Sequence, residues 1–266
     1  MELEAYLKRI EYRGVLEPTF SVLCKLHKQH LLTIPYENLD IHLGRYMPLD
    51  PEHSFTKLVT QKRGGWCYEM NSLFAWALRE IGFKVNFIEG AVLRSERGDK
   101  ARRNHLVLRV ELDKPYLADV GFGDGFLEPI PLVEGTYQQE KRTFELKELS
   151  GYWRFFNDTK GSAATYDFWL EPVSLEYFAH TCHDLQTSPE SGFVQVTVCQ
   201  GFTETSIVSL KGAVLKELTS EGLREVTISS GERYRDMLRE YFGLELDVTK
   251  LWSKVWASHL AWRELS

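Results

Sequence analysis

Apolar side chains recur at helical spacing in the first third of the chain. Residues 17–33 carry one such stripe, and Pro35 stands just beyond it. A second stripe occupies residues 67–81 and is followed by Gly82, which suits a helix C-terminus because glycine adopts the left-handed conformation without a Cβ penalty. These two segments are predicted to be amphipathic helices, the first ending before Pro35.

From about residue 84 the period of the pattern changes to two. Leu106, Leu108, Val110 and Leu112 alternate with other residues, which predicts a strand over 105–112. Further strands are expected at 85–87, 90–94, 116–121, 127–133, 152–156, 192–199, 205–210 and 223–228. The C-terminal region is expected to hold a helix around 231–242, then Gly243 and a tryptophan-rich end with Trp252, Trp256 and Trp262. Helices first, strands next and a mixed tail predict an α+β fold rather than alternating βαβ units.

Composition narrows the class of protein. The 266 residues are 43% hydrophobic and 26% charged, which is typical of a folded globular chain. A net charge of −6 gives no support for nucleic-acid or anionic-membrane partners. We find no signal-peptide pattern and no apolar run long enough to span a bilayer. The four cysteines form no paired framework, so we expect free thiols and a cytoplasmic protein.

The segment RGGWCYEMN gives the most specific indication of catalytic chemistry. Its two glycines permit an unusual turn, and Cys67 follows at the start of the predicted helix, where the helix dipole and free backbone N–H groups favour a thiolate. A free cysteine is more often a small buried hydrophobe, and we assign that role to Cys24 and Cys199. The glycine turn instead favours a nucleophile at Cys67. Glu69 and Asn71 are expected to brace the turn.

A thiol nucleophile needs a base and a group that orients the base. His105 heads one predicted strand and Asp119 lies on the returning strand over 116–121. An odd-length loop or a bulge between the strands would place both on one face, whereas an ideal two-residue loop would separate them. The order Cys, His, Asp is shared by papain-like and transglutaminase-like enzymes, so it leaves the reaction open.

Two other patterns lack the neighbouring residues or elements that their functions would require. The glycines over 121–125 match a dinucleotide loop only superficially, because no helix follows them. His180, Cys182 and His183 lack a second ligand pair at suitable spacing, so no metal site is predicted.

Together these motifs resemble one family. RGGWCYEMN resembles the RGGxCxExN signature of arylamine N-acetyltransferases. The pair at 104–105 and the DVGFG run at 119–123 resemble its histidine and aspartate motifs. LHKQHLLTIPYENLD at 26–40 is similar to LHxxHLxxIPFENLD, with Tyr36 where Phe is common. The specific match covers residues 5–126 and continues more loosely to the C-terminus.

The resemblance implies a three-part fold with a papain-like cysteine triad. An N-terminal helical bundle over residues 1–83 would carry the nucleophile. A central β-barrel-like domain over 84–190 would carry the histidine and aspartate, and an α/β lid would occupy 191–266.

It also implies a reaction. Cys67 would take the acetyl group of acetyl-CoA and pass it to an aromatic amine or hydrazine by a ping-pong mechanism without a metal, with His105 moving the proton and Asp119 holding the imidazole. Tyr36 and Phe122 would lie near the acceptor.

For acetyl-CoA, the resemblance implies contacts from Asn104, Gly123 and Phe126. Asp124 would face an anionic co-substrate unfavourably, and Arg102 and Arg103 are the nearest candidates for a basic patch. The alternatives are a papain-like or transglutaminase-like hydrolase or amide synthase, and an idle CoA- or aromatic-binding protein.

Overall fold

The computed structural model describes residues 1–203 and 205–265, with side chains to residue 261, so the side chain of Trp262 lies outside the described part. The α-helices are α1 (Leu3–Arg9), α2 (Phe20–Thr33), α3 (Leu39–His42), α4 (Pro51–Phe55), α5 (Cys67–Ile81), α6 (Arg94–Arg97), α7 (Ala179–Thr187), α8 (Gly192–Gln195), α9 (Gly231–Phe242) and α10 (Thr249–Leu265). A π-helical turn, η1 (Thr56–Thr60), continues α4, and 3₁₀ turns form η2 (Gly98–Ala101) and η3 (Leu175–Phe178).

The strands form two antiparallel sheets. They are β1 (Tyr36–Glu37), β2 (Lys84–Val92), β3 (His105–Glu111), β4 (Pro115–Ala118), β5 (Ile130–Pro131), β6 (Gly135–Gln139), β7 (Arg142–Leu149), β8 (Tyr152–Phe156), β9 (Thr165–Val173), β10 (Val198–Phe202), β11 (Ile207–Lys211), β12 (Val214–Leu218) and β13 (Leu223–Thr227). The larger sheet has the order β5-β4-β3-β2-β9-β8-β7-β6 and is nearly closed into a barrel. The smaller has the order β1-β10-β11-β12-β13.

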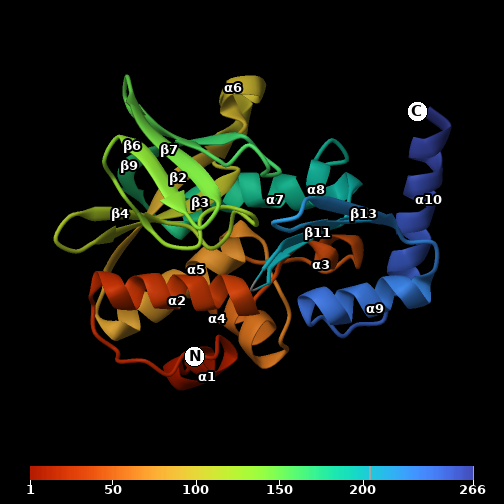
Figure 1. The fold of residues 1–266 in the computed structure, drawn as a ribbon, viewed down its shortest axis with the longest axis horizontal. Coiled ribbons are helices and arrows are strands. Elements are labelled where there is room, and N and C mark those ends of the chain that lie inside the picture. Colours follow the sequence, from red (N-terminus) through yellow and green to blue (C-terminus); the bar gives the residue numbers. More distant parts are fainter. Residues whose placement is uncertain (204, 266) are drawn as a thin grey trace.

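The N-terminal helices pack on one side of the large sheet, where α2 and α5 lie beneath the strands (Figure 1). The hydroxyl of Thr19 accepts from the N–H of Val22 and caps α2, while Gly82, at φ +103°, ends α5. Both predicted helices are therefore present, with α2 beginning three residues later than expected. Their apolar faces form one core with β3 and β4.

The interior of the barrel-like sheet is aromatic. Phe126, Phe144, Phe155, Tyr166 and Phe168 are buried there, and the rings of Phe155 and Tyr166 lie 4.8 Å apart. Burial of such rings supplies most of the apolar area that holds a small barrel together. The α+β class with a barrel-like centre is confirmed.

The small sheet joins distant parts of the chain. Tyr36 and Glu37 of β1 pair with Gln200 and Cys199 of β10, so a segment of the N-terminal region completes a C-terminal sheet. Helices α9 and α10 cover this sheet on the side away from the barrel (Figure 1). The division at 83/84 and 190/191 stays a prediction.

Several element assignments differ from the sequence-based ones. The strand expected over 192–199 is present only at its end, where β10 begins at Val198. Residues 192–195 form α8 instead, and the start of this helix is capped because the Ser191 hydroxyl accepts from the N–H of Phe193. The strand expected over 116–121 ends at Ala118. Strands β6, β7, β9 and β12 and helix α7 were not predicted. No helix in the described part of the chain is long and apolar enough to cross a bilayer.

Candidate active site

Cys67 is the first residue of α5 and is 2% exposed. Two glycines make the preceding turn possible. A Cβ on Gly64 would overlap the carbonyl oxygen of Pro35, and a Cβ on Gly65 would stand 3.0 Å from both Glu69 and Leu58. The first N–H groups of a helix have no intrahelical acceptor, so the thiol lies where an anion is stabilised. Its Sγ is 3.9 Å from the carbonyl oxygen of Asn104.

His105 and Asp119 meet because of the length of one hairpin. Residues 112–114 form a three-residue loop between β3 and β4, and the pairing of Leu108 with Ala118 fixes the register. When this register is extended by one residue, the side chain of Asp119 falls on the same face of the sheet as the side chain of His105. The expectation of an odd-length loop is therefore confirmed. The Nε2 atom of His105 lies 2.6 Å from Oδ2 of Asp119, and both side chains are buried.

Asn71 fixes the carboxylate of Asp119. Its Nδ2 donates to Oδ1 of Asp119 at 2.8 Å and to the carbonyl oxygen of Leu106 at 2.7 Å. Its Oδ1 accepts from the N–H of Val120 at 3.0 Å. The N–H of Gly121 also donates to Asp119 Oδ1 at 2.9 Å. A single amide on α5 thus ties the helix of the thiol to the strand of the histidine and to the carboxylate.

His27 supports the same carboxylate from behind, which the sequence did not reveal. Its Nε2 accepts from the N–H of Asp119 at 3.1 Å, and its Nδ1 donates to the carbonyl oxygen of Leu127 at 2.8 Å. The ring stacks on Phe126 with centroids 5.5 Å apart. Burial lowers the pKa of His27 to about 4, so the imidazole is neutral and clamps both ends of the loop 119–127.

The charges on the triad favour an imidazolium. Burial alone would lower the pKa of His105, but the Asp119 carboxylate and the Cys67 thiol, with which His105 also hydrogen-bonds, outweigh it and raise the pKa to about 10. Because Nε2 is held by Asp119, Nδ1 is the ring nitrogen left for the thiol. The arrangement provides a proton on the imidazole beside the sulfur at neutral pH.

A buried cluster of five charged side chains lies under the turn. Arg63 donates to Glu37 at 2.6 Å and to Asp40 at 3.1 Å, while Lys57 contacts Glu69 at 2.8 Å and Asp40 at 3.1 Å. Oε2 of Glu69 also accepts from the backbone N–H next to the thiol, at Trp66. Glu69 therefore braces the turn as expected. Lys57 was missed because its position in the π-helical turn η1 cannot be read from a pattern.

The two residues predicted near the acceptor lie beside the triad. Tyr36 is 8% exposed, and burial together with nearby Cys67 raises its pKa well above the ordinary value. The half-buried ring of Phe122 packs against His105 at 5.7 Å and Tyr166 at 5.1 Å.

The three residues predicted to contact CoA lie in different settings. The amide of Asn104 is engaged by the backbone of Val92 through both its oxygen, at 2.7 Å, and its nitrogen, at 3.1 Å. Gly123, at φ +94°, packs where a Cβ would overlap the side chain of Gln200. Phe126 requires a correction. Its ring is 1% exposed in the barrel core, so it supports the loop from inside and does not face a ligand.

Two charged residues also differ from expectation. Asp124 does not face a ligand. It is buried and accepts from the N–H of Ser162 at 2.6 Å and from Asn157 at 3.3 Å, and burial raises its pKa. Arg102 is held by Glu89 through two hydrogen bonds of 2.8 Å. Arg103, the other residue of the expected basic patch, is exposed.

The other cysteines and histidines discussed above are buried in the core or lie on the surface. Burial raises the pKa of Cys24 to about 12 and that of Cys199 well above its ordinary value. His180 is exposed and pairs with Asp184 at 3.0 Å. Among the described residues no group of three or more potential ligands could hold a metal ion.

The protein has an α+β fold with a nearly closed barrel-like sheet, and a thiol, an imidazole and a carboxylate are brought together in it at Cys67, His105 and Asp119. Residues 19–251 match a family model described as N-acetyltransferase. The pineal gland arylamine N-acetyltransferase isozyme NAT-3 of Gallus gallus is 32% identical over 276 residues, with 93% of this chain and 95% of that protein covered.

Solved structures agree with this assignment. The arylamine N-acetyltransferase of Mycobacterium marinum in complex with CoA superimposes with a TM-score of 0.88 at 28% identity, covering 96% of this chain and 98% of that one. The Nocardia farcinica arylamine N-acetyltransferase gives 0.86 at 32% identity, covering 96% and 93%. The chain belongs to the arylamine N-acetyltransferase family and is an acyltransferase.

Proposed function

We propose that the protein acetylates aromatic amines and hydrazines from acetyl-CoA by a ping-pong mechanism, with an acetyl group held in turn on Cys67. The observation that carries the proposal is the buried chain of contacts from the Cys67 thiol through His105 to Asp119, placed at the N-terminus of α5.

The first half-reaction uses the thiolate and imidazolium as a pair. The sulfur of Cys67 attacks the thioester carbonyl carbon of acetyl-CoA, and the bond from that carbon to the CoA sulfur breaks. His105 gives its proton to the departing sulfur, which leaves free CoA, acetyl-Cys67 and a neutral imidazole. The N–H of Cys67, with no intrahelical acceptor, is suited to stabilise the oxyanion that forms on the way.

The second half-reaction restores the pair. A neutral arylamine nitrogen attacks the acetyl carbonyl, the carbon–sulfur bond to Cys67 breaks, and His105 takes the proton that the amine loses. Asp119 holds the ring so that Nδ1 faces the sulfur throughout. The rings of Phe122 and Tyr36 flank this point and suit a flat apolar acceptor.

We expect acetyl-CoA to bind beside the loop 119–127. Gly123, at φ +94°, packs this loop against Gln200, and the exposed guanidinium of Arg103 offers a charge for phosphate. The solved structure of the relative from Mycobacterium marinum is in complex with CoA, which supports CoA as the carrier. The four free thiols support a reducing, cytoplasmic setting.

Intact-protein mass spectrometry after incubation with acetyl-CoA tests the mechanism. We expect one added acetyl group, mapped to Cys67 and removed by an aromatic amine, and no adduct on Cys67→Ser. The matched control is Cys24→Ser, which should acetylate normally. A folded protein that gains no acetyl group, yet hydrolyses amides with its thiol intact, would instead support the hydrolase alternative.

A further inference from the structure

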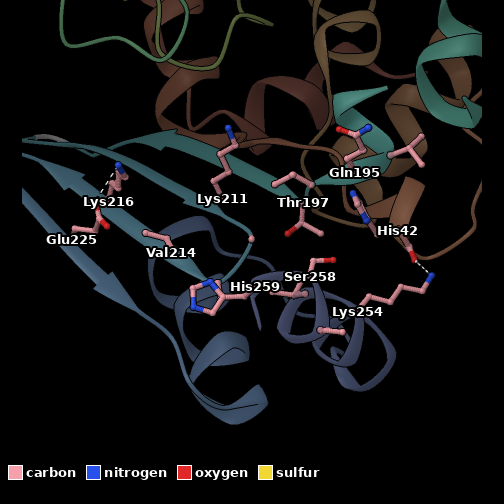
Figure 2. A pocket seen from close by; sticks show the side chains of 16 residues that line it. His42, Gln195, Thr197, Lys211, Val214, Lys216, Glu225, Lys254, Ser258 and His259 are labelled. Atoms are coloured by element: carbon pink, nitrogen blue, oxygen red, sulfur yellow. Dashed lines mark hydrogen bonds and ion pairs between the residues drawn. The ribbon is translucent and has the colours of Figure 1, made fainter. Parts of the chain in front are cut away.

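A cavity of about 710 Å³ opens on the small sheet, away from the triad. Its walls come from the turn between β11 and β12, the segment 194–197 and helix α10, and Figure 2 shows the side chains that line it. None of Cys67, His105 and Asp119 lines it. Its volume is within the range of small-molecule sites.

The lining combines apolar surface with a few hydrogen-bonding groups. Six apolar side chains contribute to it, namely Val194, Val196, Ala213, Val214, Val255 and Ala257. The hydroxyls of Thr197 and Ser258 stand beside them. Such a lining suits a compact apolar body that carries one polar end.

The charge at the cavity is opposite to that of the whole chain. Three lysines and one glutamate line it, which gives two net positive charges in a protein of net charge −6. Lys216 is paired with Glu225 at 3.0 Å, and Lys254 donates to the carbonyl oxygen of His42 at 2.8 Å. Lys211 has no ion pair within the described part of the chain, so its ammonium group is available to an anion.

His42 adds a neutral polar group to the wall. Its ring lies against the carbonyls of Val196 and Phe193, and burial lowers its pKa. Its Nε2 is buried, and no described group makes a hydrogen bond of normal geometry with it.

The wall is preformed. The amide of Asn38 donates to the carbonyls of Phe193 and Val196 at 3.0 and 2.9 Å and accepts from the N–H of Val198 at 2.7 Å. The segment 194–197 is therefore fixed before any ligand arrives, which lowers the entropic cost of binding.

We propose that this cavity is a binding site for an organic anion, a carboxylate on a medium-length apolar body, separate from the site of acetyl transfer. The carboxylate would lie between Lys211 and Lys254, and the apolar body would rest on the valines and alanines. The proposal does not depend on the transfer mechanism.

Calorimetric titration of the full chain with decanoate, in saturating CoA, tests the proposal. We expect binding of one decanoate that CoA does not displace. Lys211→Glu/Lys254→Glu should weaken it at least tenfold. The matched control Lys160→Glu/Lys250→Glu makes the same charge change at exposed lysines outside the cavity and should stay within twofold of the parent.

A second variant tests the space in the cavity separately from its charged side chains. Ser258→Trp fills the space without changing charge, and we expect at least tenfold weaker binding with acetyl transfer unchanged. Decyltrimethylammonium, which has the same chain length with a cationic head, should bind at least tenfold more weakly than decanoate. Displacement by CoA, absence of decanoate binding, or equal weakening in the lysine control would each overturn the proposal.

Discussion

At the scale of single residues, the carboxylate of Asp119 has its orientation fixed from three sides. One oxygen accepts from Asn71 and Gly121, and the other contacts His105. Because both oxygens are engaged, the carboxylate cannot rotate without losing hydrogen bonds in a buried setting. The orientation of the imidazole follows from that restraint.

The variant Asp119→Asn tests this restraint. An amide cannot stabilise the imidazolium of His105 as a carboxylate does, so the rate of alkylation of Cys67 at pH 7.5 should fall about tenfold or more. Iodoacetamide kinetics followed across pH would measure it. Asp184→Asn, which alters the exposed pair with His180, is the control and should not change the profile. An unchanged profile in Asp119→Asn would remove Asp119 from its orienting role.

His27 makes a prediction about acid stability. Its pKa is about 4 when folded, against about 6.5 in an unfolded chain. Between these values the unfolded state takes up a proton that the folded state does not. Stability is therefore lost as pH falls from 6.5 to 4, by up to about 3 kcal/mol from this residue.

His27→Gln removes this titrating group. The free energy of unfolding of the variant should therefore fall less steeply than that of the parent as pH falls from 6.5 to 4, with a slope smaller by up to about 1.4 kcal/mol per pH unit. Urea unfolding at several pH values would show the difference. His183→Gln changes an exposed histidine and should keep the parent slope. Equal slopes for His27→Gln and the parent would contradict the assignment of a neutral clamp.

At the scale of elements, the site depends on the close packing of α5 on the loop 119–127. A Cβ on Gly121 would stand 2.6 Å from the Cα of Cys67 and 2.7 Å from Nδ2 of Asn71. Gly121→Ala should therefore separate thiol from imidazole and lower kcat/KM at least tenfold, because small displacements of reacting groups are costly. Gly192→Ala, where a Cβ meets no atom within 4 Å, is the matched control for steady-state kinetics. Parent-like activity in Gly121→Ala would show that this contact is not needed.

Elements with a strong local pattern were predictable, and those set by tertiary contacts were not. The stripe over 67–81 and the glycine that ends it identify α5 to the residue. In contrast, residues 192–199 alternate like a strand, yet Ser191 caps a short helix and Asn38, far away in sequence, holds the segment after it. The hairpin β6–β7 was missed because its first strand is polar and largely exposed.

The same distinction applies to the site. The thiol, imidazole and carboxylate were predicted from motifs whose chemistry is explicit. His27 and Lys57 were not, because a buried histidine or lysine gains a role only from partners that the fold supplies.

At the scale of the whole molecule, the buried charge cluster links the N-terminal helices to the small sheet, since Glu37 belongs to β1. Lys57→Met leaves Glu69 and Asp40 without their shared cation and should destabilise the protein by about 3–5 kcal/mol in denaturant unfolding. Adding Glu69→Gln should recover part of this loss. Lys147→Met, which breaks an exposed pair, should cost less than about 1 kcal/mol. A loss that small in Lys57→Met would mean that the cluster contributes little.

The pairing of β1 with β10 has a consequence for synthesis on the ribosome. Residues 36–37 leave the exit tunnel long before residues 198–202. The pairing of β1 with β10 can therefore form only after the last quarter of the chain has begun to emerge. Until then the edge of β1 is unpaired and open to other chains. A polypeptide released early, before residue 198, would therefore be a natural substrate for chaperones and proteases, and only a chain translated past that point would escape them.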